Sequence, residues 1–326
     1  MNTTTHVPLG QSGIALSRIV LGGHEYLPDG RSRAFNEDLA KAVTPGHVFD
    51  GFGGPQRQAL LAHAFSLGID AFDVTIDSEK EALGRNLIAL GNPAAIMQTR
   101  PEGMLYSYDP GNRKLVTPGL LEAEVRRILM LTGRVQIDIL NIGILATALQ
   151  QDADYIARLS EQIALLKQKQ LIRCAAADSF SGAVTYLAMI AGGAFDSLNI
   201  NFNLADDAAA DEVLPAARAA GTTVVAREIF IKGALFNVGR ELGIEAPAVA
   251  RAGLLWAAQR RDVDALIVGA QDIGQFDASV RQIRQVQQAG TGTDEDMKTL
   301  QQLSDSDALR ALRLRNRDAF HGVANQ

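Results

Sequence analysis

Short apolar runs recur along the chain, and each is followed by a longer segment with the apolar spacing of a helix. Continuous apolar runs, rather than alternating ones, are typical of strands buried on both faces of a parallel sheet. The eight runs cover residues 18–23, 69–74, 94–99, 137–143, 172–178, 197–202, 222–228 and 264–270. Strands that alternate with helices in this number predict a (β/α)8 barrel, an α/β fold of the TIM-barrel type.

A doubly wound open sheet is the alternative fold for this alternation. Such a sheet normally has a G-x-G-x-x-G turn after its first strand. The first run ends in LGGHEY (21–26), which contains two glycines but not that spacing. The barrel is therefore the favoured fold.

Helical spacing between the runs predicts the positions of the surrounding helices. The expected ranges are 55–67, 118–131, 152–170, 211–220, 247–259 and 272–287, with a further helix from Glu79 onward. Thr117 and Pro118 are expected to begin the second of these, because a threonine cap followed by proline favours a helix start.

The chain is expected to form one domain with two parts. Residues 1–287 make the barrel, and residues 288–326 make a helical extension that packs on it. A long insertion, residues 27–54, separates the first strand from the first helix. Loops of this length are usually lids or binding loops.

Composition argues against several classes of partner. The net charge of −6 makes nucleic acid or an anionic membrane an unsuitable main partner. No apolar run reaches the length of a membrane span. Cys174 is the single cysteine, so no intrachain disulfide can form, and the N-terminus lacks the features of a secretory signal. We expect a cytoplasmic protein that acts on a small molecule, and the sequence is compatible with a homo-oligomer.

Several motifs occur in the order that they take in one enzyme family. They include VPLGQSGIALSRIVLGG (7–23), GIDAFDV (68–74), LIRCAAADSFS (171–181) and LIVGAQDIGQFDASV (266–280). Together they resemble the aldo-keto reductases, most closely the sugar-dehydrogenase-like branch, over about residues 7–285. The resemblance implies a barrel whose floor is closed by a small N-terminal hairpin.

The resemblance also implies a chemistry, namely hydride transfer between NADP(H) and a carbonyl or alcohol. In that family a tyrosine donates the proton, a lysine paired with an aspartate lowers its pKa, and a histidine orients the substrate oxygen. The aspartate corresponds to Asp73, but the tyrosine falls near Asp77 or Ser78, the lysine at Arg100 and the histidine at Gly143. Because only the aspartate is kept, we do not expect the usual reaction.

The cofactor positions implied by the resemblance differ as well. Asp178 and Ser179 stand where the family has a Ser-Asn pair for the nicotinamide carboxamide, and Phe202 replaces the tyrosine that stacks on the ring. The stretch QDIGQFDAS (271–279) lacks the cation that binds the adenosine phosphate, which leaves Lys232 as a candidate for the pyrophosphate. Phe202, Ser179 and Lys232 are thus the cofactor-binding candidates. We expect no cofactor, with NADP(H) as the alternative.

Polar residues at the ends of the expected strands offer a different site, since barrels of this kind are active at the C-terminal ends of their strands. The catalytic candidates are Asp73, Arg100, His24, Glu25, Tyr26 and Asp178. The substrate-binding candidates are Arg227, Glu102, Asn141 and Asn199. We predict no metal site, because the histidines are scattered without ligand spacing.

Asp73 and Arg100 form the central pair of this hypothesis. Arginine stays protonated, so Arg100 is suited to bind a carboxylate or phosphate, and a purely structural ion pair is the alternative. Arg227 is a second cation, and strand alternation allows only one of Arg227 and Glu228 to face the barrel axis.

His24 and Tyr26 are candidates to replace the missing histidine and tyrosine, since they follow the first strand. The alternative is that both only pack in their loop. Asp178 is a further candidate base.

Three functions remain open on the sequence alone. The expected one is a non-redox enzyme, of the lyase, dehydratase or isomerase type, that acts on a small metabolite. Two arginines, Arg100 and Arg227, at the C-terminal end of the barrel suggest that this metabolite is anionic. The second is an NADP-dependent oxidoreductase with a substituted proton donor such as Tyr26. The third is a noncatalytic small-molecule-binding or regulatory protein.

Overall fold

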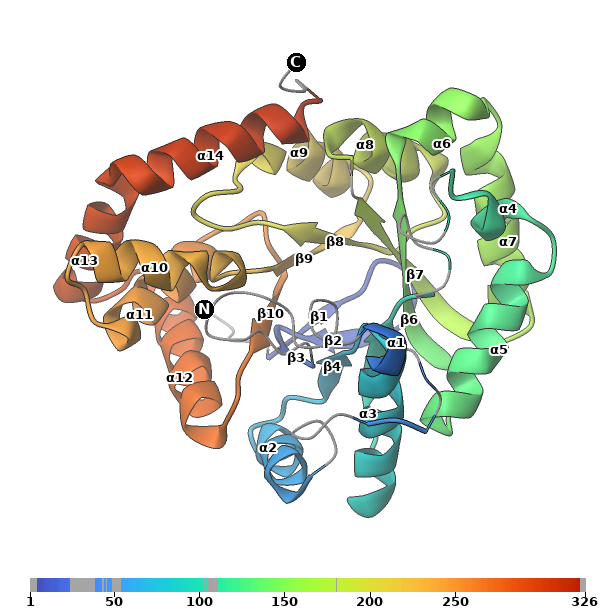
Figure 1. Cartoon of the computed structure of the whole chain (residues 1–326), viewed down its shortest axis with the longest axis horizontal. Helices are drawn as coiled ribbons and strands as arrows, with labels where there is room; N and C mark the ends of the chain where they lie inside the picture. Colours follow the sequence, from blue (N-terminus) through green and yellow to red (C-terminus); the bar gives the residue numbers. More distant parts are fainter. Residues whose placement is uncertain are drawn as a thin grey trace.

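The computed structural model describes residues 5–23, 39–42, 44, 46–48, 54–101, 104, 109, 111–179 and 181–322. Within them, eight parallel strands close into a barrel (Figure 1) in the order β10-β3-β4-β5-β6-β7-β8-β9. The strands are β3 (Ile19–Gly22), β4 (Ala71–Asp73), β5 (Ile96–Thr99), β6 (Ile137–Ile144), β7 (Ile172–Ser179), β8 (Ser197–Asn201), β9 (Thr223–Arg227) and β10 (Ala265–Gly269). Each overlaps one predicted run, so the predicted (β/α)8 barrel is confirmed.

A hairpin of β1 (His6–Pro8) and β2 (Ala15–Ser17) precedes the barrel, as expected. Its apolar residues, among them Leu9 and Leu16, form one buried cluster with inward-facing strand residues such as Ile139. This cluster fills the floor of the barrel, at the N-terminal side of the strands.

The inward-facing residues change from apolar to polar along the strands. Side chains on one face of a strand are two residues apart, so each floor residue is followed by an inward residue nearer the C-terminal end. The pairs are Ala71 and Asp73 on β4, Ile139 and Asn141 on β6, Ala176 and Asp178 on β7, and Val225 and Arg227 on β9. The floor therefore supplies stability, and the polar groups gather at the opposite end.

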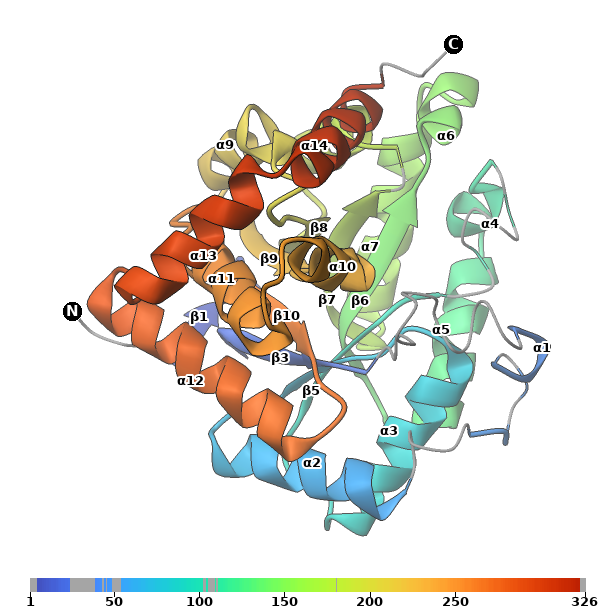
Figure 2. The same cartoon turned by 60° about the vertical axis from the view of Figure 1, so that its left-hand side comes forward.

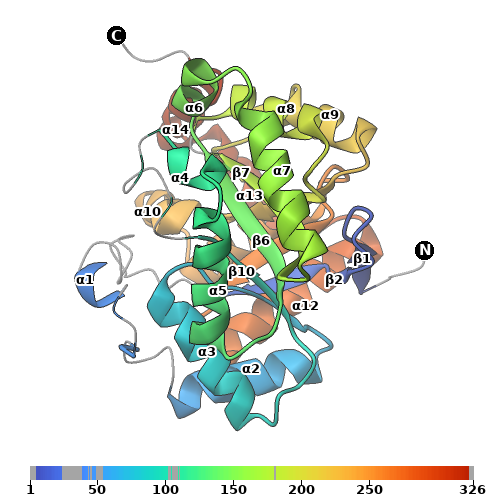
Figure 3. The ribbon, with the colours of Figure 1, turned by 90° about the vertical axis from the view of Figure 1, so that its right-hand side faces the viewer.

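Helices surround the barrel. Up to α12, the longer ones are α2 (Pro55–Ser66), α3 (Asp77–Ala89), α5 (Leu120–Thr132), α7 (Tyr155–Gln168), α8 (Ala183–Gly192), α10 (Ala234–Glu241), α11 (Ala246–Ala258) and α12 (Ile273–Ala289). Shorter ones are α1 (Leu39–Ala42), α4 (Arg113–Val116), α6 (Ala146–Gln151) and α9 (Val213–Ala219). Figure 2 shows α12, α2 and α3 along one side, and Figure 3 shows α5 and α7 together outside β6 and β7.

The structure differs from the predicted helices at several places, and three of these differences have a local explanation. The backbone of Gly119 is left-handed, with φ of 80°, so α5 begins at Leu120 and not at Pro118. The carboxylate of Glu79 accepts hydrogen bonds from the backbone N–H groups of Thr75 and Ile76, which allows α3 to begin two residues before Glu79. Helix α8 is absent from the predicted set because its sequence, AVTYLAMIAG, is apolar on almost every side and shows no helical periodicity.

The C-terminal extension consists of α13 (Asp294–Asp305) and α14 (Asp307–Phe320). Leu303 and Leu309 are fully buried in a cluster that includes Leu204 and Leu235. The extension therefore packs on the barrel beside the loop that follows β8. Among the described helices, none is both long enough and apolar enough to cross a membrane.

Candidate functional site

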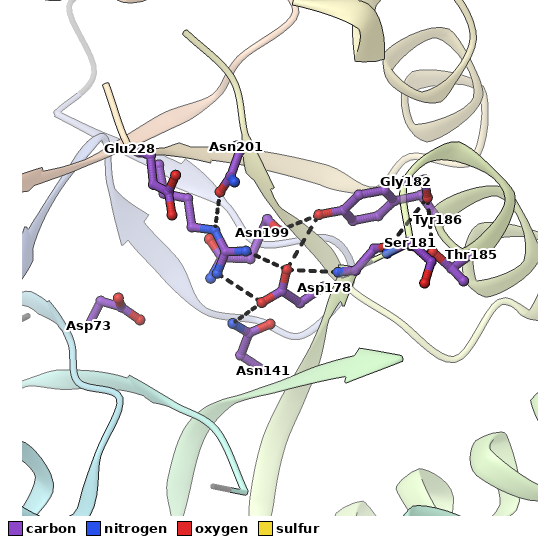
Figure 4. Close-up of polar contacts among 12 residues, drawn as sticks. Asp73, Asn141, Asp178, Ser181, Gly182, Thr185, Tyr186, Asn199, Asn201 and Glu228 are labelled. Atoms are coloured by element: carbon purple, nitrogen blue, oxygen red, sulfur yellow. Dashed lines mark hydrogen bonds and ion pairs between the residues drawn. The ribbon is translucent and has the colours of Figure 1, made fainter. Parts of the chain in front are cut away.

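Asp178 and Arg227 form the central contact at the C-terminal end of the barrel. The guanidinium of Arg227 donates to both carboxylate oxygens of Asp178, at 2.6 and 2.8 Å, and its Nε donates to Asn201 Oδ1 at 2.8 Å (Figure 4). Of Arg227 and Glu228, it is thus Arg227 that faces the barrel axis. Because this fork-to-fork geometry is rigid, the pair fixes the plane of the guanidinium.

The carboxylate of Asp178 is 1% exposed, and several neighbours stabilise its charge. The backbone N–H of Ser179 donates to it at 2.7 Å, Asn141 Nδ2 at 3.3 Å and the Tyr186 hydroxyl at 3.4 Å. Burial opposes the charge on Arg227, but Asp178, Tyr186 and Glu228 together outweigh burial and raise the pKa of Arg227. Arg227 therefore remains charged, and Asp178 balances most of that charge.

Asp73 approaches the same region from β4. In Figure 4 the side chain of Asp73 lies across from that of Asp178. Gln98 Nε2, on the neighbouring strand β5, donates to Asp73 Oδ1 at 2.8 Å. Burial, and to a smaller extent the charge of Glu79, raises the pKa of Asp73, whereas the hydrogen bond from Gln98 and the charges of Arg227 and Arg100 act in the opposite direction. Gln98 is therefore the hydrogen-bond partner of Asp73, and Arg227 influences this carboxyl more strongly than Arg100, the partner that the sequence suggested.

Several buried polar atoms near this pair have no hydrogen-bond partner in the described part of the chain. They are Asn141 Oδ1 and both amide atoms of Asn199, whose residues are at most 3% exposed. Buried polar groups are nearly always satisfied, by protein, water or ligand. These atoms therefore mark positions where polar atoms of a bound molecule can be held. A guanidinium also has more N–H groups than Arg227 uses in its three bonds.

The predicted cofactor residues do not present free groups in the way that the resemblance implied. Phe202 is fully buried against Trp256, with ring centroids 5.1 Å apart, and the guanidinium of Arg260 lies 5.2 Å from its ring centroid. The Ser179 hydroxyl is used locally, since it accepts from the backbone N–H of Ser181 at 2.9 Å. Lys232 pairs with Glu228 at 3.4 Å. The cofactor-binding roles of these three residues stay predictions.

Four predicted site residues, His24, Glu25, Tyr26 and Glu102, lie outside the described residues, as does most of the insertion at 27–54. Their roles stay predictions. Within the described ranges, no group of three or more His, Cys, Asp or Glu side chains is arranged to hold a metal ion.

Asn201, Gln98 and Tyr186 belong to this site but were not among the candidates from the sequence. Gln98 lies on β5, two positions before Arg100, which directly follows the strand, so strand alternation could have indicated that Gln98 faces inward. Tyr186 lies in α8, where the nearly uniform apolar sequence gives no sign that its hydroxyl reaches Asp178.

Comparison with known proteins adds no assignment. No protein-family model matches the chain, and no curated protein matches its sequence. The evidence for function therefore rests on the fold and on the residues at the end of the barrel.

Proposed function

We propose that the protein is a non-redox enzyme on an aldo-keto-reductase-like barrel, which carries out acid–base chemistry of the lyase, dehydratase or isomerase type on a small metabolite. The observation that carries this proposal is the Asp73 carboxyl, whose pKa burial raises, close to an arginine that Asp178 holds in a fixed orientation. A carboxyl with a raised pKa exchanges protons more readily near neutral pH.

Each residue has a distinct role in this proposal. Asp73 transfers the proton through Oδ2, because Gln98 binds Oδ1. Arg227 stabilises negative charge that develops on a substrate oxygen, and its fixed orientation avoids reorganisation during the reaction. Asn141 Oδ1 and the side-chain amide of Asn199 bind polar substrate atoms. Arg100, just after β5, is the second cation of this end of the barrel and would contribute with Arg227 to binding an anionic substrate.

NADP-dependent reduction is the alternative enzyme activity. The buried position of Phe202 and the Lys232–Glu228 ion pair do not favour it. A noncatalytic binding protein would use the same polar residues without proton transfer.

The test is proton exchange in D2O without added cofactor. The full-length protein is incubated with a panel of small oxo acids, hydroxy acids and aldehydes, and loss of the hydrogen next to the carbonyl or hydroxyl carbon is followed by ¹H NMR. We expect exchange with at least one compound and a loss of at least about 100-fold in Asp73→Asn, since general acid–base catalysis contributes about that much. Asp70→Asn is the matched control, because Asp70 lies near the N-terminal end of the same strand beside His6.

The proposal would be contradicted if Asp73→Asn kept the exchange activity of the wild type. It would also be contradicted if the wild type exchanged the hydrogen of none of the compounds. NADPH fluorescence titration provides the second arm. Micromolar binding together with NADPH oxidation by an aldehyde would establish the reductase instead.

A further inference from the structure

Tyr186 connects two of the strands that carry the site. Its side chain is 3% exposed, and its hydroxyl donates to the backbone carbonyl of Asn199 on β8 at 2.9 Å (Figure 4). The same hydroxyl lies 3.4 Å from Asp178 Oδ1 on β7. Burial, followed by the charge of Asp178, raises the pKa of Tyr186, so it stays protonated and acts as a donor.

The ring of Tyr186 is supported by the end of the C-terminal extension. Phe320, the last residue of α14, stacks on it with a centroid distance of 6.4 Å. Gly182, just before α8, is so close to α14 that a Cβ there would lie 2.1 Å from the carbonyl oxygen of Phe320. The end of α14 is thus seated directly on the loop between β7 and α8.

The extension also binds the loop that follows β8. Arg313 donates to the Leu204 carbonyl at 2.7 and 3.0 Å, and Asn316 Nδ2 donates to the Ala205 carbonyl at 2.9 Å. One helix therefore holds the segments that follow the two strands carrying Asp178 and Asn201, which are the two partners of Arg227.

We propose that Tyr186 is a positioning residue through which the C-terminal extension holds Asp178, and thereby Arg227, in place. Its importance for catalysis rests on the proposed function. The hydroxyl has a single proton, which it shares between the Asn199 carbonyl at 2.9 Å and Asp178 Oδ1 at 3.4 Å. Removing the hydroxyl would leave this buried carbonyl without that donor and would also remove a favourable dipole from beside Asp178.

The test is the titration of the Asp73 carboxyl by ¹³C NMR in the ligand-free, full-length protein. In Tyr186→Phe the charge of Asp178 is less compensated, so Arg227 stabilises the Asp73 carboxylate less and the pKa of Asp73 shifts further upward. Tyr155→Phe is the matched control. Tyr155 is also buried, but its hydroxyl donates to the Asn112 carbonyl at 2.8 Å and contacts no residue of the site.

We expect both variants to lower the melting temperature and only Tyr186→Phe to shift the Asp73 titration. A titration that is unchanged in both would overturn the proposal and leave Tyr186 a structural residue. Since no substrate is present, this outcome is independent of the proton-exchange assay. If Asp73→Asn retained exchange activity, the proposed function would fail while the titration would still report on Tyr186.

The role of the extension is tested by a second pair of variants. Phe320→Ala removes the ring behind Tyr186, and Leu314→Ala on the same helix changes a side chain that is 63% exposed. We expect Phe320→Ala to shift the Asp73 titration in the same direction as Tyr186→Phe, and Leu314→Ala to leave it unchanged. A shift in Tyr186→Phe without one in Phe320→Ala would contradict the part assigned to the extension.

Discussion

At the scale of single residues, the candidate site depends on how one buried cation is compensated. Arg227 binds Asp178 through two hydrogen bonds and Asn201 through a third. A buried ion pair of this kind adds little net stability compared with apolar residues, but breaking it leaves an uncompensated charge. Its main contribution here is to hold the guanidinium in one orientation near Asp73.

Asp178→Asn should therefore be strongly destabilising. An asparagine cannot accept both hydrogen bonds from the guanidinium, and the charge of Arg227 would stay buried without its partner. We expect a loss of about 3–5 kcal/mol in the free energy of unfolding, measured by urea denaturation. The double variant Asp178→Leu with Arg227→Met should recover much of that loss, because it removes both charges. A single variant as stable as the wild type would show that the pair is not buried as described.

At the scale of elements, the loop between β7 and α8 is shaped by contact with α14. Gly182 has φ of 73° and ψ of −147°, a conformation that favours glycine, and it also lies against the Phe320 carbonyl. Gly193 directly follows α8. It has φ of 69°, but no atom lies within 4 Å of the position that a Cβ would take. Both glycines have a positive φ, but only Gly182 is also packed closely against another helix.

We predict that Gly182→Ala destabilises the protein more than Gly193→Ala. Both substitutions impose an unfavourable φ, at a cost of about 1–3 kcal/mol, but only the first places a methyl group against the backbone of α14. Urea unfolding of the two variants measures the difference. Equal losses in the free energy of unfolding would contradict this prediction, since they would mean that α14 moves to accommodate the methyl group without destabilising the protein.

At the scale of the whole molecule, stability and chemistry lie at opposite ends of the barrel. The hairpin and the inward-facing apolar residues fill the floor, whereas carboxylates, amides and an arginine fill the other end. Charged groups held together in this way make folding stability depend on pH. Asp206, in the loop after β8, has a pKa raised to about 7 by burial, followed by the charges of Glu228 and Asp207.

The sign of this dependence follows from the raised pKa. Protonation of Asp206 is easier in the folded protein than in the unfolded chain, so its stabilising contribution is complete below about pH 4 and is lost as the pH rises through about 7. We expect Asp206→Asn to gain stability relative to the wild type between pH 4 and pH 8, as measured by melting temperature across that range. A constant difference between the two proteins would contradict the raised pKa.

The sequence by itself determined the fold and the orientation of the site. The eight apolar runs predicted the strands, and strand alternation with the position of each strand end indicated that Asp73, Asn141 and Asp178 gather at one end of the barrel. These features follow from local periodicity and from the parallel arrangement, which places all the C-terminal strand ends together.

Only the tertiary structure decided which of these side chains meet. Asp178 and Arg227 are 49 residues apart, and their pairing depends on the closure, tilt and register of the barrel. Asp73 meets Gln98 on the neighbouring strand, and Tyr186 reaches Asp178 from a helix without a sequence signal. Periodicity encodes the face on which a side chain lies, whereas its partner across the barrel depends on the distances that the closed sheet sets.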